Sequence, residues 1–165
     1  MTTTDWLPPL ITLDRCGGEW DMWNRVLYAA YVEDFLKGPV MWRGFRVSTR
    51  RHPETDGKSA TFWHLTTAEE DGQGRLPDVR RAERIRWAKV LITAPEDKVR
   101  TWVQPDRSEL SLGIAVPDFS YVVFLTPLSD RVHLKTAYYV EQLSTQKRYE
   151  GQWQKGHDFT LPLVP

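Results

Sequence analysis

Four short runs rich in β-branched and aromatic residues fill the second half of the chain and constrain its fold most strongly. They cover residues 99–103, 110–116, 120–126 and 132–140, and Pro105, Pro117 and the stretch 127–130 separate them. Such residues favour strands, and proline interrupts them. Because no segment between these runs is long enough for the crossover that parallel strands need, antiparallel pairing is favoured, with the last two runs as a hairpin.

Helices are expected around these strands. Apolar residues recur every three or four positions between Gly18 and Gly38, which predicts an N-terminal helix that covers the sheet. A second helix is predicted from Pro77 to about Ile92, since proline suits the first helical turn and Asp78 suits the positive end of the helix dipole. A polar helix is expected over residues 144–155. The order of elements predicts an α+β fold.

A further strand pair is predicted before the second helix. Residues 40–49 and 60–67 are rich in aromatic and β-branched types, and the polar stretch 50–59 contains Pro53 and Asp56-Gly57. This pattern is typical of two strands joined by a long turn. We therefore expect a hairpin here, followed by an acidic loop over residues 68–75.

Length and composition predict one soluble domain. The chain has 165 residues, 41% of them hydrophobic and 27% charged, which is ordinary for a folded domain. We expect an irregular arm over residues 1–16 and a core over residues 18–155. No apolar run is long enough to span a bilayer, and the N-terminus lacks the features of a signal peptide. We therefore expect a cytoplasmic protein with no membrane partner.

Several kinds of site have no candidate residues. Cys16 is the single cysteine, and the four histidines lack the spacing that places two metal ligands on one helix face. Neither GxxxxGK[ST], GxGxxG nor GxSxG occurs. We therefore expect no metal and no cofactor, and any chemistry must use His, Arg, Lys, Thr and Tyr.

These residue types suffice for metal-independent cleavage of RNA, in which the substrate's own 2′-hydroxyl attacks the neighbouring phosphate. The reaction needs a base, an acid and cations. The chain carries 22 basic and 22 acidic residues, so it has no overall attraction to polyanions. The segment from Arg43 to Arg100 has a small basic excess, which is enough for a few phosphate contacts.

His64 is the first candidate for the acid or the base. If residues 60–67 form a strand, Phe62 and His64 share one face and Trp63 and Leu65 the other, so that His64 can line a groove. The alternative is a half-buried histidine bonded to a backbone carbonyl. His52 and His157 fit a solvated environment better, and His133 is intermediate.

Arginines of the second helix are candidates for phosphate binding. Arg80 and Arg84 lie one turn apart, with Arg81 beside them. The alternative is a solvated face whose arginines pair with Asp78 and Glu83.

The last predicted strand supplies further candidates. Thr136 and Tyr138 alternate with Lys135, Ala137 and Tyr139, so that only one of these two sets is expected to line a groove. The alternative is a purely structural strand.

Three pieces together resemble a known family. They are the Trp63-His64-Leu65 segment, the arginine-rich stretch 78–87 (DVRRAERIRW), and residues 121–125 (YVVFL) followed by 134–138 (LKTAY) and 147–150 (KRYE). Over residues 62–150 the chain looks like phage- and mobile-element-associated members of the barnase-EndoU-colicin-RelE (BECR) ribonuclease superfamily. The N-terminal helix and the hairpin insertion lie outside the shared part.

The resemblance implies a metal-independent ribonuclease of the toxin or defence-effector type, with helices packed on a four-stranded antiparallel sheet. It implies His64, Arg84, Thr136 and Tyr138 as active-site residues, Arg81 and Lys135 as supporting cations, and RNA and a protein inhibitor or antitoxin as partners. Arg80 is added as a substrate-binding candidate from its place on the helix. The competing hypotheses are a non-catalytic module that binds nucleic acid or protein, and a small-molecule transferase without a recognisable signature.

Overall fold

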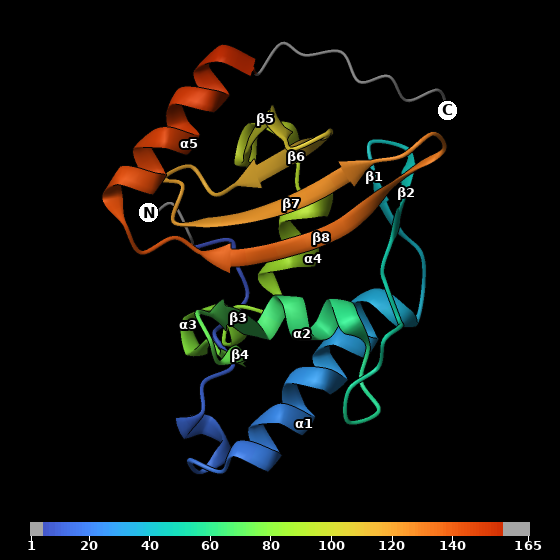
Figure 1. Ribbon diagram of the computed structural model, residues 1–165, viewed down its shortest axis with the longest axis vertical. Helices are drawn as coiled ribbons and strands as arrows, with labels where there is room; N and C mark the ends of the chain where they lie inside the picture. Colours follow the sequence, from blue (N-terminus) through green and yellow to red (C-terminus); the bar gives the residue numbers. More distant parts are fainter. Residues whose placement is uncertain (1–4, 157–165) are drawn as a thin grey trace.

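A six-stranded sheet organises the computed structural model, which describes residues 5–156 (Figure 1). The strand order is β1-β2-β8-β7-β6-β5, and every pair is antiparallel except β2 with β8. The strands are β1 (Val40–Trp42), β2 (Phe45–Ser48), β5 (Arg100–Asp106), β6 (Glu109–Ala115), β7 (Tyr121–Pro127) and β8 (Arg131–Tyr139).

The four strands expected in the second half of the chain are confirmed as β5 to β8, and the fold is α+β as predicted. The sheet has six strands rather than four, because residues 40–48 add β1 and β2 at the β8 edge. This stretch was expected to be one strand. It folds back at Arg43 and Gly44, both with positive φ, which is the backbone conformation of a two-residue hairpin turn.

The predicted strand over residues 60–67 is wrong: α2 (Ala60–Thr66) is a helix. It buries Thr61, Phe62, Leu65 and Thr66, and this spacing matches one face of a helix. Aromatic and β-branched composition favoured a strand, but such preferences yield to burial. The predicted hairpin insertion is therefore absent, and residues 49–59 instead link β2 to α2.

The N-terminal helix is confirmed as α1 (Trp20–Tyr31), which continues into a π-helical turn, η2 (Val32–Leu36). It does not cover the sheet as expected. It packs against α2, where the rings of Tyr28 and Tyr31 lie 5.0 and 5.9 Å from that of Phe62. Figure 1 shows α2 lying between α1 and β8. Of the expected irregular arm, the described residues 5–16 contain only the short turn η1 (Asp14–Cys16).

The helix predicted from Pro77 to Ile92 is divided into α3 (Val79–Ala82) and α4 (Trp87–Thr93). Between them, backbone hydrogen bonds span three residues instead of four, as in the bond from Arg84 N–H to the Arg81 carbonyl. A short turn, η3 (Glu96–Lys98), then leads into β5. Ala82, Ile85 and Ala88 are all buried, so one apolar face continues through this tighter link, whereas Val79 at the start of α3 is exposed.

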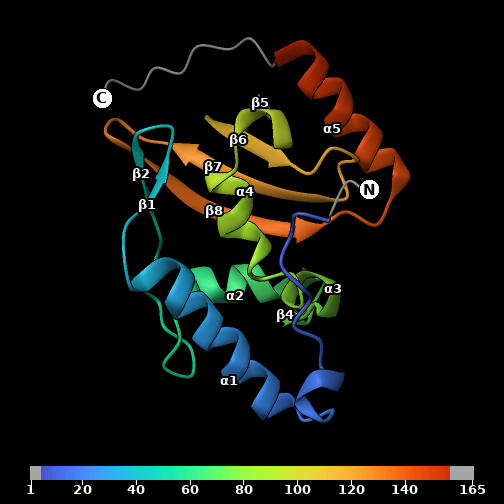
Figure 2. The same ribbon diagram turned by 180° about the vertical axis from the view of Figure 1, so that it is seen from behind.

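The two faces of the sheet are covered unequally. Helix α4 packs behind it, against β1, β6 and β7 (Figure 2). The predicted C-terminal helix, α5 (Leu143–Gly156), covers only the β5 end of the front face, where Tyr149 contacts Trp102.

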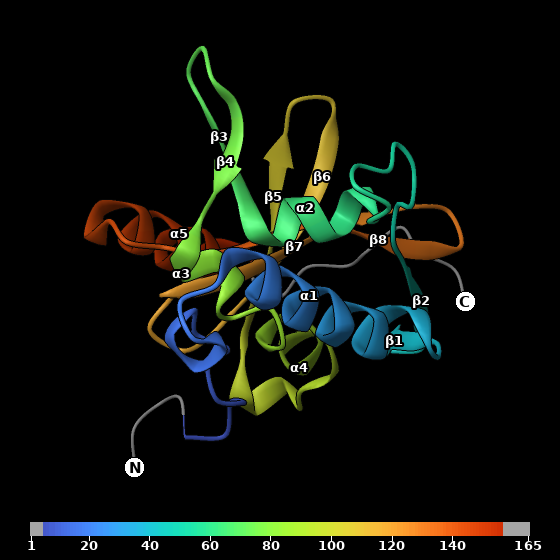
Figure 3. The same cartoon turned by 90° about the horizontal axis from the view of Figure 1, so that it is seen from below.

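A two-stranded ribbon stands beside the remaining part of the front face. Its strands are β3 (Thr67–Glu70) and β4 (Gly74–Pro77), where an acidic loop was expected. Figure 3 shows this ribbon and the β5–β6 hairpin projecting to the same side of the sheet. No helix within residues 5–156 has the length and apolar character needed to cross a bilayer.

Candidate active site

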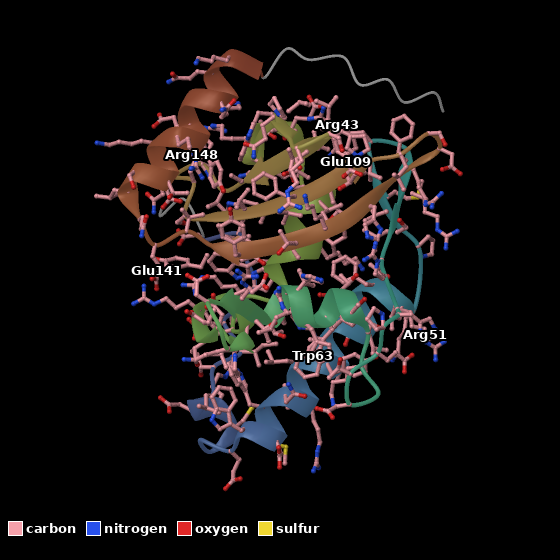
Figure 4. All side chains as sticks on the ribbon, viewed as in Figure 1. Arg43, Arg51, Trp63, Glu109, Glu141 and Arg148 are labelled. Carbon is pink, nitrogen blue, oxygen red and sulfur yellow. The ribbon has the colours of Figure 1, made fainter. Side chains whose placement is uncertain are left out.

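A cleft of about 670 Å³ occupies the uncovered part of the front face. We call it the main cleft. Helix α2 and strand β8 border it. Its rim is completed by the β3–β4 ribbon, the β7–β8 turn and Glu109 of the β5–β6 hairpin. Glu109 is labelled in Figure 4. Its lining residues are Arg50, Thr61, His64, Glu69, Arg75, Arg81, Glu109, Thr126, Leu128, Arg131, His133, Leu134, Lys135, Thr136 and Tyr138.

A β-bulge in β8 determines which side chains reach the main cleft. Thr136 pairs with Phe124 and Leu134 pairs with Leu125, so Lys135 is an extra residue without a partner on β7. The sequence predicted that Lys135 and Thr136 would lie on opposite faces. That prediction is wrong, because the extra residue interrupts the alternation and both side chains line the cleft.

His64 lines the main cleft from α2 instead of from a strand. Burial, followed by the positive charges of Arg75, Arg50 and Arg81, lowers the pKa of its imidazole. The ring is therefore held in its neutral form near pH 7. A neutral imidazole in a cationic cleft can accept a proton from a substrate hydroxyl.

The backbone carbonyl of His64 fixes the helix to the rest of the site. Arg81 Nη1 donates to it at 3.0 Å and Thr136 Oγ1 at 3.2 Å. Arg81 also lies 3.5 Å from Asp78 and stacks over the ring of Tyr138, 5.3 Å from its centroid. Both Arg81 and Thr136 therefore position His64 on the floor formed by β8.

His133 is a second histidine in the main cleft, which the sequence analysis did not select. Its Nδ1 lies 3.0 Å from Ser48 Oγ on β2. Burial, then the charges of Arg50 and Arg131, lowers the pKa of His133. The alternation of side chains along β8 was the sequence signal that could have indicated His133. Its position, however, is determined by the bulge and by the pairing of β8 with β2.

Two arginines that were not predicted, Arg50 and Arg75, add to the positive charge of the main cleft. Arg75 donates to the hydroxyl and the carbonyl of Thr67, at 2.8 and 2.7 Å. Within residues 5–156 neither Arg50 nor Arg75 forms an ion pair, whereas Arg131 pairs with Asp130 and Lys135 with Asp106. Sequence reasoning missed Arg75 because it follows an acidic segment, and Arg50 because it lies in a linker.

Arg84 and Arg80 were predicted to bind phosphate, but neither lines the main cleft. Arg84 pairs with Glu83 at 2.9 Å and stacks on the rings of Trp87 and Tyr139. Arg80 pairs with Glu141 at 3.3 Å beside a separate shallow pocket. The break after α3 places Arg84 in a turn, so the alignment expected from one continuous helix is lost.

Tyr138 contributes its ring to the main cleft, but its hydroxyl is engaged. That hydroxyl hydrogen-bonds to the hydroxyl of Tyr149, and burial together with this bond raises the pKa of Tyr138. Tyr138 therefore stays protonated at neutral pH. Its ring supplies an aromatic wall.

The remaining histidines do not add to the site. His52 is exposed in the linker between β2 and α2, and His157 lies outside the described residues. Within residues 5–156 no three His, Cys, Asp or Glu side chains are grouped so as to hold a metal ion. Comparison of the chain with protein-family models, with curated proteins and with solved structures found no match.

Proposed function

We propose that the chain is an endoribonuclease that cleaves RNA through attack of the substrate's 2′-hydroxyl on the adjacent phosphate. The observation that supports this most is the occurrence of two half-buried histidines with lowered pKa values in one cleft that also contains two unpaired arginines. Acid–base catalysis of this reaction needs those groups together.

In the proposed reaction His64 acts as the base, because burial and then the charges of three arginines lower its pKa and favour its neutral form. It takes the proton of the 2′-hydroxyl, and the resulting oxygen forms a bond to phosphorus. The bond from phosphorus to the 5′-oxygen breaks, and protonated His133 supplies a proton to that oxygen. The products are a 2′,3′-cyclic phosphate and a 5′-hydroxyl end.

The scissile phosphate has a defined place in this proposal. Arg50 and Arg75 bind its oxygens and offset the charge that develops on them. The phosphate anion in turn raises the pKa of an imidazole beside it, which allows His133 to carry a proton in the complex. Arg81 and Thr136 act through His64, as positioning residues.

The test is cleavage of a short single-stranded RNA in the presence of a chelator, with detection of the cyclic phosphate end. We expect cleavage by the wild type and a loss of about 10²–10⁴-fold in kcat for His64→Ala and for His133→Ala. His52→Ala, an exposed histidine of the same chain, is the matched control. RNA binding without cleavage, or cleavage that survives His64→Ala, contradicts the proposal.

A cellular experiment addresses the proposed toxin role. Expression of the wild type is expected to arrest growth, and His64→Ala is expected to relieve the arrest. If the wild-type protein is harmless although it cleaves RNA in vitro, the toxin role is wrong and the ribonuclease activity stands. We propose a protein inhibitor as a partner only if expression of the wild-type protein arrests growth.

A further inference from the structure

A smaller hollow of about 220 Å³ opens beside the main cleft, and we call it the side pocket. It shares Lys135, Thr136 and Tyr138 with the main cleft, so the two are continuous along the bulged part of β8. The remaining lining residues are Gln104, Asp106, Ser111, Phe124 and Tyr149.

Three aromatic rings form one side of this pocket. Phe124 packs edge-on against Tyr149, with ring centroids 5.6 Å apart, and lies 6.1 Å from Tyr138. The hydroxyls of Tyr138 and Tyr149 are hydrogen-bonded to each other. These contacts hold an apolar surface in a fixed shape, which suits a planar ligand.

The same pocket carries polar groups with fixed orientations. Gln104 Oε1 accepts a hydrogen bond from the indole of Trp102 at 2.9 Å, which leaves the amide NH₂ of Gln104 as a donor. Ser111 and Lys135 both donate to Oδ2 of Asp106, which leaves Oδ1 as an acceptor. The pocket therefore offers a donor and an acceptor beside an aromatic wall.

The charges distinguish the two compartments. The main cleft carries unpaired arginines and attracts phosphate, whereas in the side pocket the charges of Asp106 and Lys135 offset each other and leave no free cation for a phosphate. We propose that the side pocket binds a nucleobase next to the scissile phosphate and thereby determines which nucleotide is cut. This inference rests on the proposed ribonuclease function and assigns its base specificity to Gln104 and Asp106.

The experiment uses 2′-O-methyl oligonucleotides of each single base and an abasic oligomer of equal length. They lack the attacking hydroxyl and stay intact. For the wild type we expect one base to bind at least about 10-fold more tightly than the abasic oligomer, the range expected for one base on aromatic side chains. We expect the side-chain amide signal of Gln104 to shift in the NMR spectrum with that oligomer and to stay in place with the abasic one.

Gln104→Glu keeps an oxygen for the indole of Trp102 and removes the amide donor. It is expected to reduce the preference over the abasic oligomer to about twofold or less, consistent with loss of a base contact. Gln154→Glu introduces the same charge on an exposed position of α5 and is the matched control, with the preference unchanged. Thermal unfolding of both variants verifies that they are folded.

Equal binding of all bases and of the abasic oligomer overturns the side-pocket assignment. So does a base preference that Gln104→Glu leaves intact, or that Gln154→Glu lowers equally. In each of these cases His64-dependent cleavage still supports the proposed function. If no oligomer binds and no RNA is cleaved, both proposals are wrong.

Discussion

Ser48 Oγ lies 3.0 Å from Nδ1 of His133, because β2 and β8 pair in parallel with these two residues directly opposite each other. The contact joins residues 85 positions apart in the chain. With Nδ1 engaged, Nε2 is the nitrogen that His133 has left for a substrate. The strand register therefore sets how the second imidazole of the main cleft can act.

Replacing Ser48 by alanine is expected to reduce kcat of RNA cleavage about 10-fold, because the ring of His133 loses the partner that holds its orientation. Ser48→Thr keeps the hydroxyl and is expected to retain most of the activity. The ¹⁵N chemical shift of Nδ1 of His133 reports the loss of this contact and is expected to change in Ser48→Ala. An unchanged Nδ1 shift together with unchanged kcat would show that the contact does not position this histidine.

The lowered pKa values of His64 and His133 predict how stability depends on pH. Below about 6.5, the pKa of an unperturbed histidine, the unfolded chain binds more protons than the folded one. The free energy of unfolding therefore rises with pH between the lowered folded-state pKa values and 6.5. As pH falls through that window the free energy of unfolding decreases, because His64 and His133 are more easily protonated in the unfolded chain.

The measurement is the unfolding midpoint at pH 5.5 and at pH 7.5. His64→Gln is expected to have a smaller difference between the two midpoints than the wild type. His52→Gln changes an exposed histidine and is expected to keep the wild-type difference. An equal difference in all three proteins would mean that His64 has the same pKa in the folded and the unfolded chain.

Arg75 and Arg84 are expected to have separate roles. Arg75→Ala removes an unpaired cation of the main cleft, so the affinity for single-stranded RNA should fall and the salt dependence of log K should lessen by about 0.7. Arg84→Ala should leave RNA binding unchanged. It removes the stacking of the guanidinium 4.3 Å over Tyr139 and should lower the free energy of unfolding by about 0.5–2 kcal/mol.

Fluorescence titration of labelled RNA at several salt concentrations, together with chemical denaturation, tests this pair of variants. If Arg84→Ala weakens RNA binding as much as Arg75→Ala does, the two arginines do not have separate roles. The substrate then extends beyond the main cleft toward the face on which Arg84 lies.

The sequence was sufficient to predict those strands and helices that depend on a local residue pattern. The strands β5 to β8 and the helices α1 and α5 follow from periodicity and proline placement, and His64, Thr136, Tyr138, Arg81 and Lys135 do line one cleft. Arg84 was expected in the site but does not line the main cleft. Its position depends on the break after α3, which the apolar periodicity of the sequence does not reveal. His133 was missed because its place depends on β2 pairing with β8, a contact distant in sequence, and Arg50 because it lies in the linker after β2.

The bulge at Lys135 leads to a prediction about deletion. Leu134 and Ala137 are buried on either side of it, and Lys135 is the residue without a partner on β7. Without Lys135, β8 becomes a regular strand in which both buried residues still face the core. The lost ion pair with Asp106 is exposed and contributes at most about 1 kcal/mol. The deletion variant is therefore expected to fold with an unfolding midpoint within a few degrees of the wild type.

Deletion of Ala137 is the matched control in the same strand. No extra residue is available there, so the loss moves Tyr138 toward the core and Tyr139 away from it. This variant is expected to be unfolded or strongly destabilised, as measured by circular dichroism and thermal unfolding. If the two deletions were equally damaging, the bulge would not be the reason that Lys135, Thr136 and Tyr138 all reach the main cleft. If the Lys135 deletion folds, its RNA cleavage isolates what the cation adds to a site whose histidines are still in place.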